Sequence, residues 1–333
     1  FFVPKNERRE ENVYRKILVF VFASLAILLS TFRDLKSLPW GNDTPIYSMM
    51  DNRYSHTSWE YLIDNFSFYS TDYSVRDLGY PIFIKITQFF VEDFTFFMFL
   101  TAFIFIVPLS QLIYRYVKSY LGIVLAFLIY FVLFQNIVNS FMRQAIVLGL
   151  LLFGIRYILN SKWKQYLALM TIAFTIHSSS VLAVPLYFLV RCNLQKTWML
   201  LCILISPLFI YYSSWIITYV ASDTVYDGYA EDNMVLPLNY ILFILIISLL
   251  TYVNFDRIKS IVGGKLLLSG TLGSLLVLPL VGMGNTLLRT SYYFTLFLIP
   301  LFPLILDNMK MKKVTRISLY VICILFFSIY LFI

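Results

Sequence analysis

Charged residues are scarce in this 333-residue sequence: Asp, Glu, Lys and Arg together make up only 13% of it. An ordinary soluble domain carries about 25% charged residues. Apolar residues reach 60%, and the mean hydropathy is +0.78. A water-soluble fold cannot bury that much apolar surface, so we expect the solvent around most of the chain to be lipid.

Cysteine and histidine are also rare, with three and two copies. The odd number of cysteines, at Cys192, Cys202 and Cys323, without paired spacing, argues against a disulfide framework and against a cysteine-based metal site. Two histidines argue against a histidine-built metal centre. The sequence also lacks the glycine-rich nucleotide loops, the zinc-protease motif and the Gly-x-Ser-x-Gly nucleophile motif. We therefore expect no cofactor and no metal.

The formal net charge of +8 is small for this length, and the basic residues stand in short clusters between apolar runs. Cytoplasmic loops of membrane proteins are rich in Lys and Arg in this way. The excess of basic residues is therefore explained by their positions in cytoplasmic loops, and no nucleic-acid partner is expected.

Apolar runs of about 20 residues, the helical length that crosses a hydrocarbon core of about 30 Å, recur along the whole chain. The candidate spans are residues 14–32, 94–114, 120–138, 141–159, 165–190, 197–220, 237–254, 264–282, 286–306 and 315–333. A further apolar helix at about 80–91 is too short to span. The sequence predicts an all-α, polytopic transmembrane bundle of about ten spans, forming a single integral membrane domain over 1–333.

The sequence begins with the apolar residues 1–3 and then turns polar. We expect residues 1–3 to be the end of an earlier transmembrane helix, so that a further N-terminal span precedes this chain. A cleaved signal peptide is the alternative. It would place the basic cluster at residues 8–16 on the outer side, against the positive-inside rule.

The charged clusters assign sides to the loops. The basic clusters at 8–16, 115–118, 156–164, 191–196, 257–265 and 310–316 are predicted to be cytoplasmic. The acidic, aromatic-rich segment 33–79 is predicted to be a long outer loop with short helices, and the acidic stretch 223–232 also falls outside.

This assignment puts both ends of segment 165–190 in the cytoplasm, so that the segment must cross an even number of times. We predict a hairpin of two short or tilted helices that turns near His177. Non-helical backbone at membrane depth is tolerated only where it is buried in protein or lines a wet cavity. The alternative is one long helix, with a span miscounted elsewhere.

Four ionisable residues at comparable depth on the outer side are the main functional candidates: Arg33, Arg143, His177 and Arg289. An Arg at a helix centre costs about 2.5–3.5 kcal/mol on insertion scales, so it usually faces a cavity or a partner. Arginines that converge from separate helix ends would bind phosphate oxygens in bidentate fashion. Each Arg can instead reach the lipid headgroups, and His177 can be a satisfied interior histidine.

Further candidates lie in the outer loop and on the short helix that follows it, each with two interpretations. Asp43 is either a carboxylate base for a sugar hydroxyl or a helix N-cap ahead of Thr44-Pro45. Arg76-Asp77 forms either a simple salt bridge or a polar contact for a glycan. Lys85 either reaches a phosphate from its short helix or extends to the headgroups.

Five short motifs, in order along the chain, resemble those of the EpsG/Wzy-type polysaccharide (O-antigen) polymerase family. Arg33 followed by Gly41-Asn42-Asp43-Thr44-Pro45-Ile46-Tyr47 is similar to R…G-x-D-x-x-x-Y; Asp77-Leu78-Gly79-Tyr80 to E-x-G-Y/F; Phe141-Met142-Arg143-Gln144-Ala145 to hydrophobic-x-R-Q-x; Ile176-His177-Ser178-Ser179 to F-H-x-S; and Arg289 with Tyr292-Tyr293-Phe294 to a late R…Y-F element. Asp77 departs from the family's Glu, which keeps the carboxylate but shortens its reach.

The resemblance implies a glycosyltransferase in the bacterial inner membrane, with its active site facing the periplasm and a role in lipopolysaccharide-type biosynthesis. It would transfer a growing glycan from undecaprenyl diphosphate to the next lipid-linked repeat unit. The implied partners are an undecaprenyl-diphosphate-linked oligosaccharide, membrane lipid and, in addition, a chain-length regulator.

The resemblance also implies roles for individual residues. His177 is expected to be the base or proton shuttle at the acceptor hydroxyl, with Asp43 as second choice or as a residue that orients an Arg. Arg143 and Arg289 are expected to bind the diphosphate. Arg33 is expected to be an additional or supporting cation there. The residues expected to bind substrate are Arg33, Tyr47, Arg76, Asp77, Tyr80, Lys85 and Tyr292.

Two other classes of function stay open at this point. A glycan ligase or a membrane acyltransferase could also use a histidine at membrane depth, but an acyl donor has no evident need for the arginines. A flippase or transporter for lipid-linked sugar would need polar groups accessible from both faces, whereas these are predicted on one side. Many transporters have short or interrupted hydrophobic segments at corresponding positions of two halves of the chain. This sequence has no such pair, which further weakens the transporter interpretation.

Overall fold

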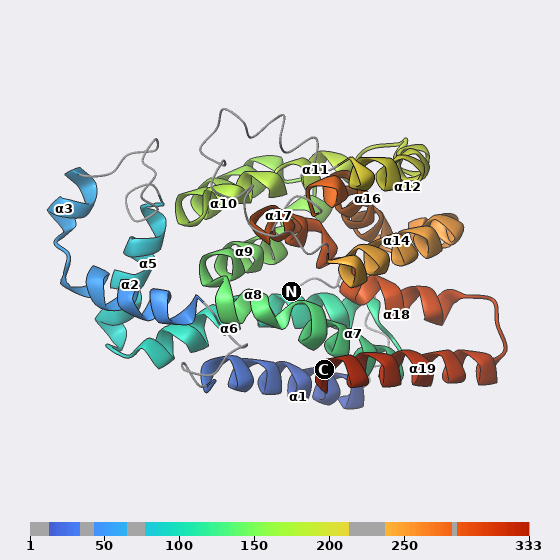
Figure 1. The fold of residues 1–333 in the computed structure, drawn as a ribbon, viewed down its shortest axis with the longest axis horizontal. Coiled ribbons are helices and arrows are strands. Elements are labelled where there is room, and N and C mark those ends of the chain that lie inside the picture. Colours follow the sequence, from blue (N-terminus) through green and yellow to red (C-terminus); the bar gives the residue numbers. More distant parts are fainter. Residues whose placement is uncertain (1–12, 34–42, 65–76, 213–236, 282–284, 333) are drawn as a thin grey trace. The chain divides into compact units, whose positions relative to one another are not determined.

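The computed structural model describes residues 13–33, 43–64, 77–212, 237–281 and 285–332. Those residues form α-helices and one short 3-10 helix, with no β-strand among them, which confirms the all-α prediction (Figure 1). The chain groups into two compact units, Phe1–Val181 with Leu319–Ile333, and Leu182–Ser318. The single membrane domain over 1–333 stays a prediction.

Four helices of the described segments are long and apolar enough to cross a membrane: α1 (Val13–Thr31), α6 (Phe94–Tyr116), α9 (Met142–Leu159) and α16 (Gly264–Val281). Each lies within two residues of a predicted span at both ends. A fifth span results if α17 (Asn285–Thr295) and α18 (Leu298–Asn308), which are bent by 44° at their junction, count as one. The total of about ten spans stays a prediction.

Shorter helices occupy most of the remaining predicted spans. They are α7 (Tyr120–Leu133), α8 (Gln135–Ser140), α10 (Trp163–Ile176), α11 (Pro185–Leu189), α12 (Gln195–Tyr211) and α14 (Leu238–Val253), with α15 (Phe255–Ser260) in a connection. The predicted span at 315–333 is occupied by α19 (Lys313–Phe332), which has 20 residues. The predicted helix at 120–138 is interrupted at Phe134, where α7 ends and α8 begins.

Segment 165–190 breaks where the sequence predicts it to. The α10 helix ends at Ile176, and His177 follows in an extended conformation with φ −156° and ψ 112°. A 3-10 helix, η1 (Ser178–Ala183), and then α11 continue the chain. The break at His177 is thereby confirmed, while the antiparallel course of the two arms stays a prediction.

In the first unit, α1 packs along α6, and α6 packs on α9 (Figure 1). Gly149 permits the second contact, because a Cβ there would lie 2.8 Å from the carbonyl carbon of Ile104 on α6. Helix association within lipid depends on such close backbone approach, since lipid tails are as apolar as the side chains they would replace. The start of α1 is fastened to the end of α6 by Arg15, which donates to the carbonyl oxygens of Tyr114 and Val117, both at 2.8 Å.

The outer loop predicted at 33–79 contributes two short helices to the first unit, α2 (Thr44–His56) and α3 (Trp59–Asp64). The α5 helix (Gly79–Phe90) follows, and its 12 residues confirm the predicted short apolar helix at about 80–91. It packs against both α2 and α10.

The second unit is centred on α16, which packs against α12, α14 and α17. Two glycines of α16 allow that packing: a Cβ at Gly270 would lie 2.7 Å from Cγ of Phe297, and one at Gly273 would lie 2.6 Å from Cγ of Phe294.

Candidate active site

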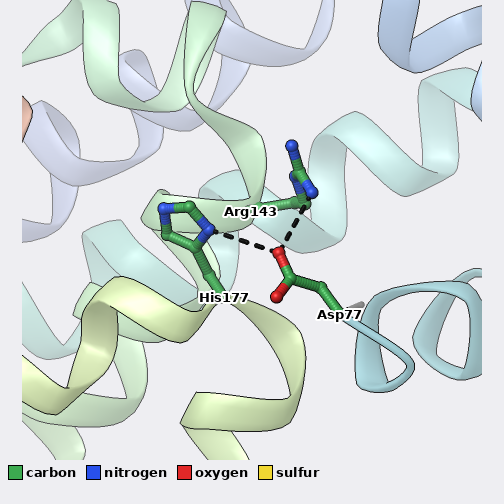
Figure 2. A network of polar contacts seen from close by, with 3 residues as sticks. All are labelled: Asp77, Arg143 and His177. Carbon is green, nitrogen blue, oxygen red and sulfur yellow. Dashed lines mark hydrogen bonds and ion pairs between the residues drawn. The ribbon is translucent and has the colours of Figure 1, made fainter. Parts of the chain in front are cut away.

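A carboxylate, a guanidinium and an imidazole meet in the first unit (Figure 2). Arg143 donates from Nη1 to Oδ2 of Asp77 at 3.2 Å, and Nδ1 of His177 lies 3.7 Å from the same oxygen. The three residues come from three places in the fold: the residue before the first turn of α5, the first turn of α9 and the end of α10. All three are candidates from the sequence alone, whereas their mutual contact is visible only in the fold.

Burial in this cluster is uneven. The side chain of Asp77 is only 1% exposed, whereas Arg143 is 14% and His177 24% exposed. A buried carboxylate is strongly disfavoured unless it is paired. Asp77 therefore forms the floor of the cluster, and the two basic side chains lie above it on the side that solvent or a substrate can reach.

Gly79 brings Asp77 to His177. A Cβ at Gly79 would lie 2.8 Å from the carbonyl carbon of Thr175 and would also collide with its Oγ1. Thr175 is two residues before His177, so the missing side chain lets the start of α5 lie directly against the end of α10. The backbone N–H of Tyr80 donates to the carbonyl oxygen of Asp77 at 3.0 Å and fixes this turn.

Arg143 rests on aromatic side chains. Its guanidinium carbon lies 5.6 Å from the ring centroid of Tyr80, a cation–π distance, and its side chain also hydrogen-bonds to Tyr47. The Tyr80 ring in turn meets Tyr47, Tyr54 and Phe97 edge to face, with centroids 6.0, 6.5 and 6.1 Å apart. These rings limit the directions in which the guanidinium can point.

Tyr47 and Tyr80 are expected from the sequence to contact substrate. The structure buries them to 7% and 1% exposure, beneath Arg143. Burial raises the pKa of the Tyr80 hydroxyl well above its ordinary value, so this group stays protonated at any physiological pH. The geometry gives both residues a positioning role, while direct glycan stacking stays a prediction.

His177 ends α10 and is held by its own backbone. Its N–H donates to the carbonyl oxygen of Ala173, and its carbonyl accepts from Ser180, both at 3.0 Å. The ring presents Nδ1 to Asp77, and the other ring nitrogen points away from that carboxylate (Figure 2). At 3.7 Å the contact with Asp77 is longer than a hydrogen bond and acts mainly through charge. A negative charge on the Nδ1 side favours a proton there and leaves Nε2 as the acceptor.

Arg33 links three helices of the first unit through its hydrogen bonds. It donates to the carbonyl oxygen of Ser30, to Oγ1 of Thr44 at 3.2 Å and to the carbonyl oxygen of Asn139 at 3.0 Å. Thr44 also donates to that Asn139 oxygen at 2.7 Å. Burial lowers the pKa of Arg33 to about 10, so the group keeps its charge at neutral pH. Its contacts join the ends of α1 and α8 to the start of α2. The α8 partner, Asn139, lies four residues before Arg143 in the sequence.

Asp43 stands at the N-cap position of α2, but its side chain makes no cap hydrogen bond. The simple capping interpretation therefore lacks its expected contact, and the role of Asp43 as a base or an orienting group stays a prediction. Arg76, the neighbour of Asp77, lies outside the described residues.

Lys85 has a different environment from the one expected of a phosphate ligand. Its Nζ donates to the carbonyl oxygens of Tyr54 at 3.3 Å and Thr57 at 2.6 Å, and it lies 5.0 Å from the ring centroid of Trp59. These carbonyls belong to the C-terminal end of α2, where a cation opposes the negative end of the helix dipole. The contacts give Lys85 a capping role, and its contact with substrate stays a prediction.

Arg289 and Tyr292 belong to α17 in the second unit. The Tyr292 ring is 6% exposed and meets the Tyr240 ring edge to face at 6.1 Å. The Tyr240 hydroxyl hydrogen-bonds to Ser291 at 2.8 Å and to Thr295 at 2.7 Å, which ties α14 to α17. The convergence of Arg289 with Arg143 on one substrate stays a prediction.

Sequence reasoning did not single out Thr44, Asn139 or Thr175, which place the site residues. A signal exists for one of them: Asn139 is a polar residue in an apolar run, shortly before Arg143. The roles of Thr44 and Thr175 depend on contacts between distant segments. In the described part of the chain, no group of three or more His, Cys, Asp or Glu side chains could hold a metal ion.

A bundle of apolar helices that buries a carboxylate between an arginine and a histidine defines a multi-pass membrane protein with a built polar site. The model of the EpsG family matches residues 15–333, and the chain therefore belongs to the EpsG family. This membership supports a Wzy-like polysaccharide polymerase at the level of the family. No curated protein and no solved structure matches the chain.

Proposed function

We propose that this protein is a polysaccharide polymerase of the O-antigen type, which transfers a growing glycan from undecaprenyl diphosphate to the next undecaprenyl-diphosphate-linked repeat unit. The observation that carries the proposal is the Asp77 carboxylate shared by Arg143 and His177. Family membership supplies the class of reaction, and this cluster supplies a cation for the leaving group beside a base for the acceptor.

The position of the cluster along its helices supports a reaction on the periplasmic face. Within α9, Arg143 and Arg156 are 13 residues apart, and Lys164 near the start of α10 is 13 residues before His177, which follows its end. Each interval is about 20 Å of helix at 1.5 Å per residue. The basic ends of both helices are cytoplasmic by the positive-inside rule, so the ends that carry the cluster lie toward the periplasm.

Arg143 acts on the leaving group in this proposal. The bond between the anomeric carbon of the growing glycan and the diphosphate oxygen breaks, and the diphosphate departs with the bonding electron pair. A guanidinium fixed by Asp77 and Tyr80 meets the developing negative charge without reorganisation, which is where fixed charges contribute most to catalysis. Arg33, which donates to the carbonyl oxygen of Asn139 in α8, supports the segment that leads to Arg143.

His177 acts on the acceptor. The acceptor hydroxyl oxygen forms the new bond to the anomeric carbon, and its proton passes to Nε2 of His177. Asp77, on the Nδ1 side, stabilises the resulting imidazolium. An imidazole has an unperturbed pKa of about 6.5, near the pH at which a general base works best.

The test is complementation of a polymerase-deleted strain, with glycan ladders and membrane levels measured for each variant. His177→Ala and Arg143→Ala should leave only single-repeat product. Two matched controls should keep full ladders: His56→Ala, which removes the other histidine, an exposed one, and Arg156→Ala, which removes an arginine at the opposite end of α9.

Two outcomes would overturn the proposal. Full ladders from both His177→Ala and Arg143→Ala would refute the site. Failure of the wild-type protein to make a ladder with its native repeat unit would refute polymerisation; lipid-linked repeats retained on the cytoplasmic face would then indicate a flippase. If a strain that lacks this protein makes normal lipid-linked polymer but does not pass it to a final acceptor, the protein would be a ligase.

A further inference from the structure

A groove of about 810 Å³ lies between α1 and α6 in the first unit, away from the Asp77 cluster. Its middle is apolar, with Phe20 and Ala23 on one wall and Phe103 on the other. Its charged residues, Lys16 and Arg115, stand at the same end, where α1 begins and α6 finishes. The groove therefore has a long apolar body and one basic end.

We propose that this groove binds a single anionic phospholipid of the cytoplasmic leaflet, with an acyl chain between α1 and α6 and the phosphate at Lys16 and Arg115. Both residues belong to the clusters that the positive-inside rule assigns to the cytoplasm. Anionic headgroups of that leaflet are attracted to such juxtamembrane basic residues. Charge complementarity thus selects a lipid with a negative headgroup over a zwitterionic one.

The length of the groove fits one leaflet. On α1 it extends from Lys16 to Leu28, a rise of about 18 Å at 1.5 Å per residue. Half of a hydrocarbon core of about 30 Å is about 15 Å. A phospholipid anchored at the basic end therefore spans the groove with its acyl chain. The volume also lies within the range of about 300–1,000 Å³ that is typical of small-molecule sites.

The basic end of the groove is held in place by side-chain contacts between α1 and α6. Arg15 directs its guanidinium to the carbonyl oxygens of Tyr114 and Val117 and lies 4.7 Å from the Tyr114 ring centroid, which fixes α1 against α6 at this point. Lys16, the next residue, lines the groove instead. Gln111 and Tyr114 line the same end and offer hydrogen-bond donors to phosphate and ester oxygens.

The open side of the groove faces the surface of the bundle. Phe20 is 71% exposed and Phe103 is 45% exposed, while Ala23 between the helices is 7% exposed. The two phenylalanines thus flank a buried apolar floor that includes Val19, Ala23 and Ile27, a surface that accepts a hydrocarbon chain. The proposed lipid stabilises the pairing of α1 with α6, and this role is independent of the glycosyl-transfer reaction.

The experiment titrates phosphatidylglycerol into delipidated full-length protein in detergent and counts bound lipids by native mass spectrometry. The key variant is Lys16→Ala/Arg115→Ala, and its matched control is Lys162→Ala/Lys164→Ala, which removes two charges from the same side without touching the groove. We expect the key variant to bind the first lipid about thirtyfold more weakly, the loss that corresponds to two basic contacts at a membrane surface. The control should bind as the wild type does.

A third variant, Ser24→Trp, fills the groove with a side chain and should abolish the first lipid site while both basic residues remain. Equal binding of phosphatidylcholine and phosphatidylglycerol by the wild type would overturn the proposal. A loss of phosphatidylglycerol binding with Ser24→Trp, combined with wild-type binding by Lys16→Ala/Arg115→Ala, would also overturn it, because the site would then select a hydrocarbon chain and not a charged headgroup. A concentration-dependent dimer that Ser24→Trp abolishes would assign the groove to a second copy of this chain.

Discussion

Neutralising Asp77 tests the site through stability, independently of any glycan. Asp77→Asn keeps the shape of the side chain and removes the charge that Arg143 and His177 share. Removing one partner of a buried ion pair costs about 3–5 kcal/mol, because the other charge is left buried. Arg143 is 14% exposed and keeps its contact with Tyr47, so we expect a cost near the lower limit, about 3 kcal/mol.

The companion variants complete a double-mutant cycle. Arg143→Gln should cost less than Asp77→Asn, because His177 at 3.7 Å can take up a proton and compensate the carboxylate. The double variant Asp77→Asn/Arg143→Gln leaves no unpaired charge, and its loss should fall short of the sum of the two single losses by about 1–3 kcal/mol.

The assay is thermal unfolding of the purified protein in detergent. At about 2 °C per kcal/mol for a chain of this size, Asp77→Asn should lower the midpoint by about 6 °C. Asp256→Asn is the control: it breaks the exposed pair with Lys196, whose N–O distance is 2.7 Å, and should change the midpoint little. Strict additivity of the two single losses would refute the buried ion pair, as would an unchanged midpoint for Asp77→Asn.

Three further predictions concern the surroundings of the cluster. Gly79→Ala should push α5 from α10 against the Thr175 backbone, lower stability by about 1–3 kcal/mol and shorten glycan ladders although every polar site residue is retained; normal ladders would contradict this. Lys85→Met should lower the thermal midpoint slightly by removing the cap on α2 and leave ladders intact, whereas lost ladders at an unchanged midpoint would assign Lys85 to a substrate phosphate. Burial raises the pKa of Asp51 above its ordinary value of 3.8, so its charged form destabilises the fold at neutral pH. Asp51→Asn should therefore raise the midpoint at pH 7, and this advantage should vanish as the pH falls to about 4, where the wild-type carboxyl is protonated; an advantage that persists at pH 4 would refute the argument.

The long helices could be predicted from the sequence because nothing competes with their apolar runs. The α6 helix begins at residue 94 as predicted, and α9 differs from its prediction by one residue at its start. The break at Phe134 could not be predicted, since no glycine or proline marks it. There Gln135 donates to Oγ of Ser30 at 2.6 Å, a contact between segments about 100 residues apart. Tertiary contacts of this kind override local helix preference.

The candidate site was predictable in its members and not in its arrangement. Charges in apolar surroundings identified Arg143 and His177, because such charges are costly without a function or a partner. For Asp77 the sequence left a simple salt bridge and a glycan contact open; the structure makes it the common ion-pair partner of both, and a glycan contact stays a prediction. Tyr80 is buried below Arg143, and its expected contact with substrate stays a prediction. A single sequence does not encode which distant residues meet, so these roles required the fold.

One oxygen atom, Oδ2 of Asp77, faces both Arg143 and His177. Arg143 and His177 both interact with the negative charge of this oxygen. A stronger interaction with one of them therefore weakens the interaction with the other. In the proposed reaction, a donor diphosphate that engages Arg143 would free more of that charge for the imidazole and make His177 a stronger base while the donor is in place. Without donor the histidine would be a poorer base, which would restrain the protein from deprotonating acceptor or water before there is a glycan to transfer.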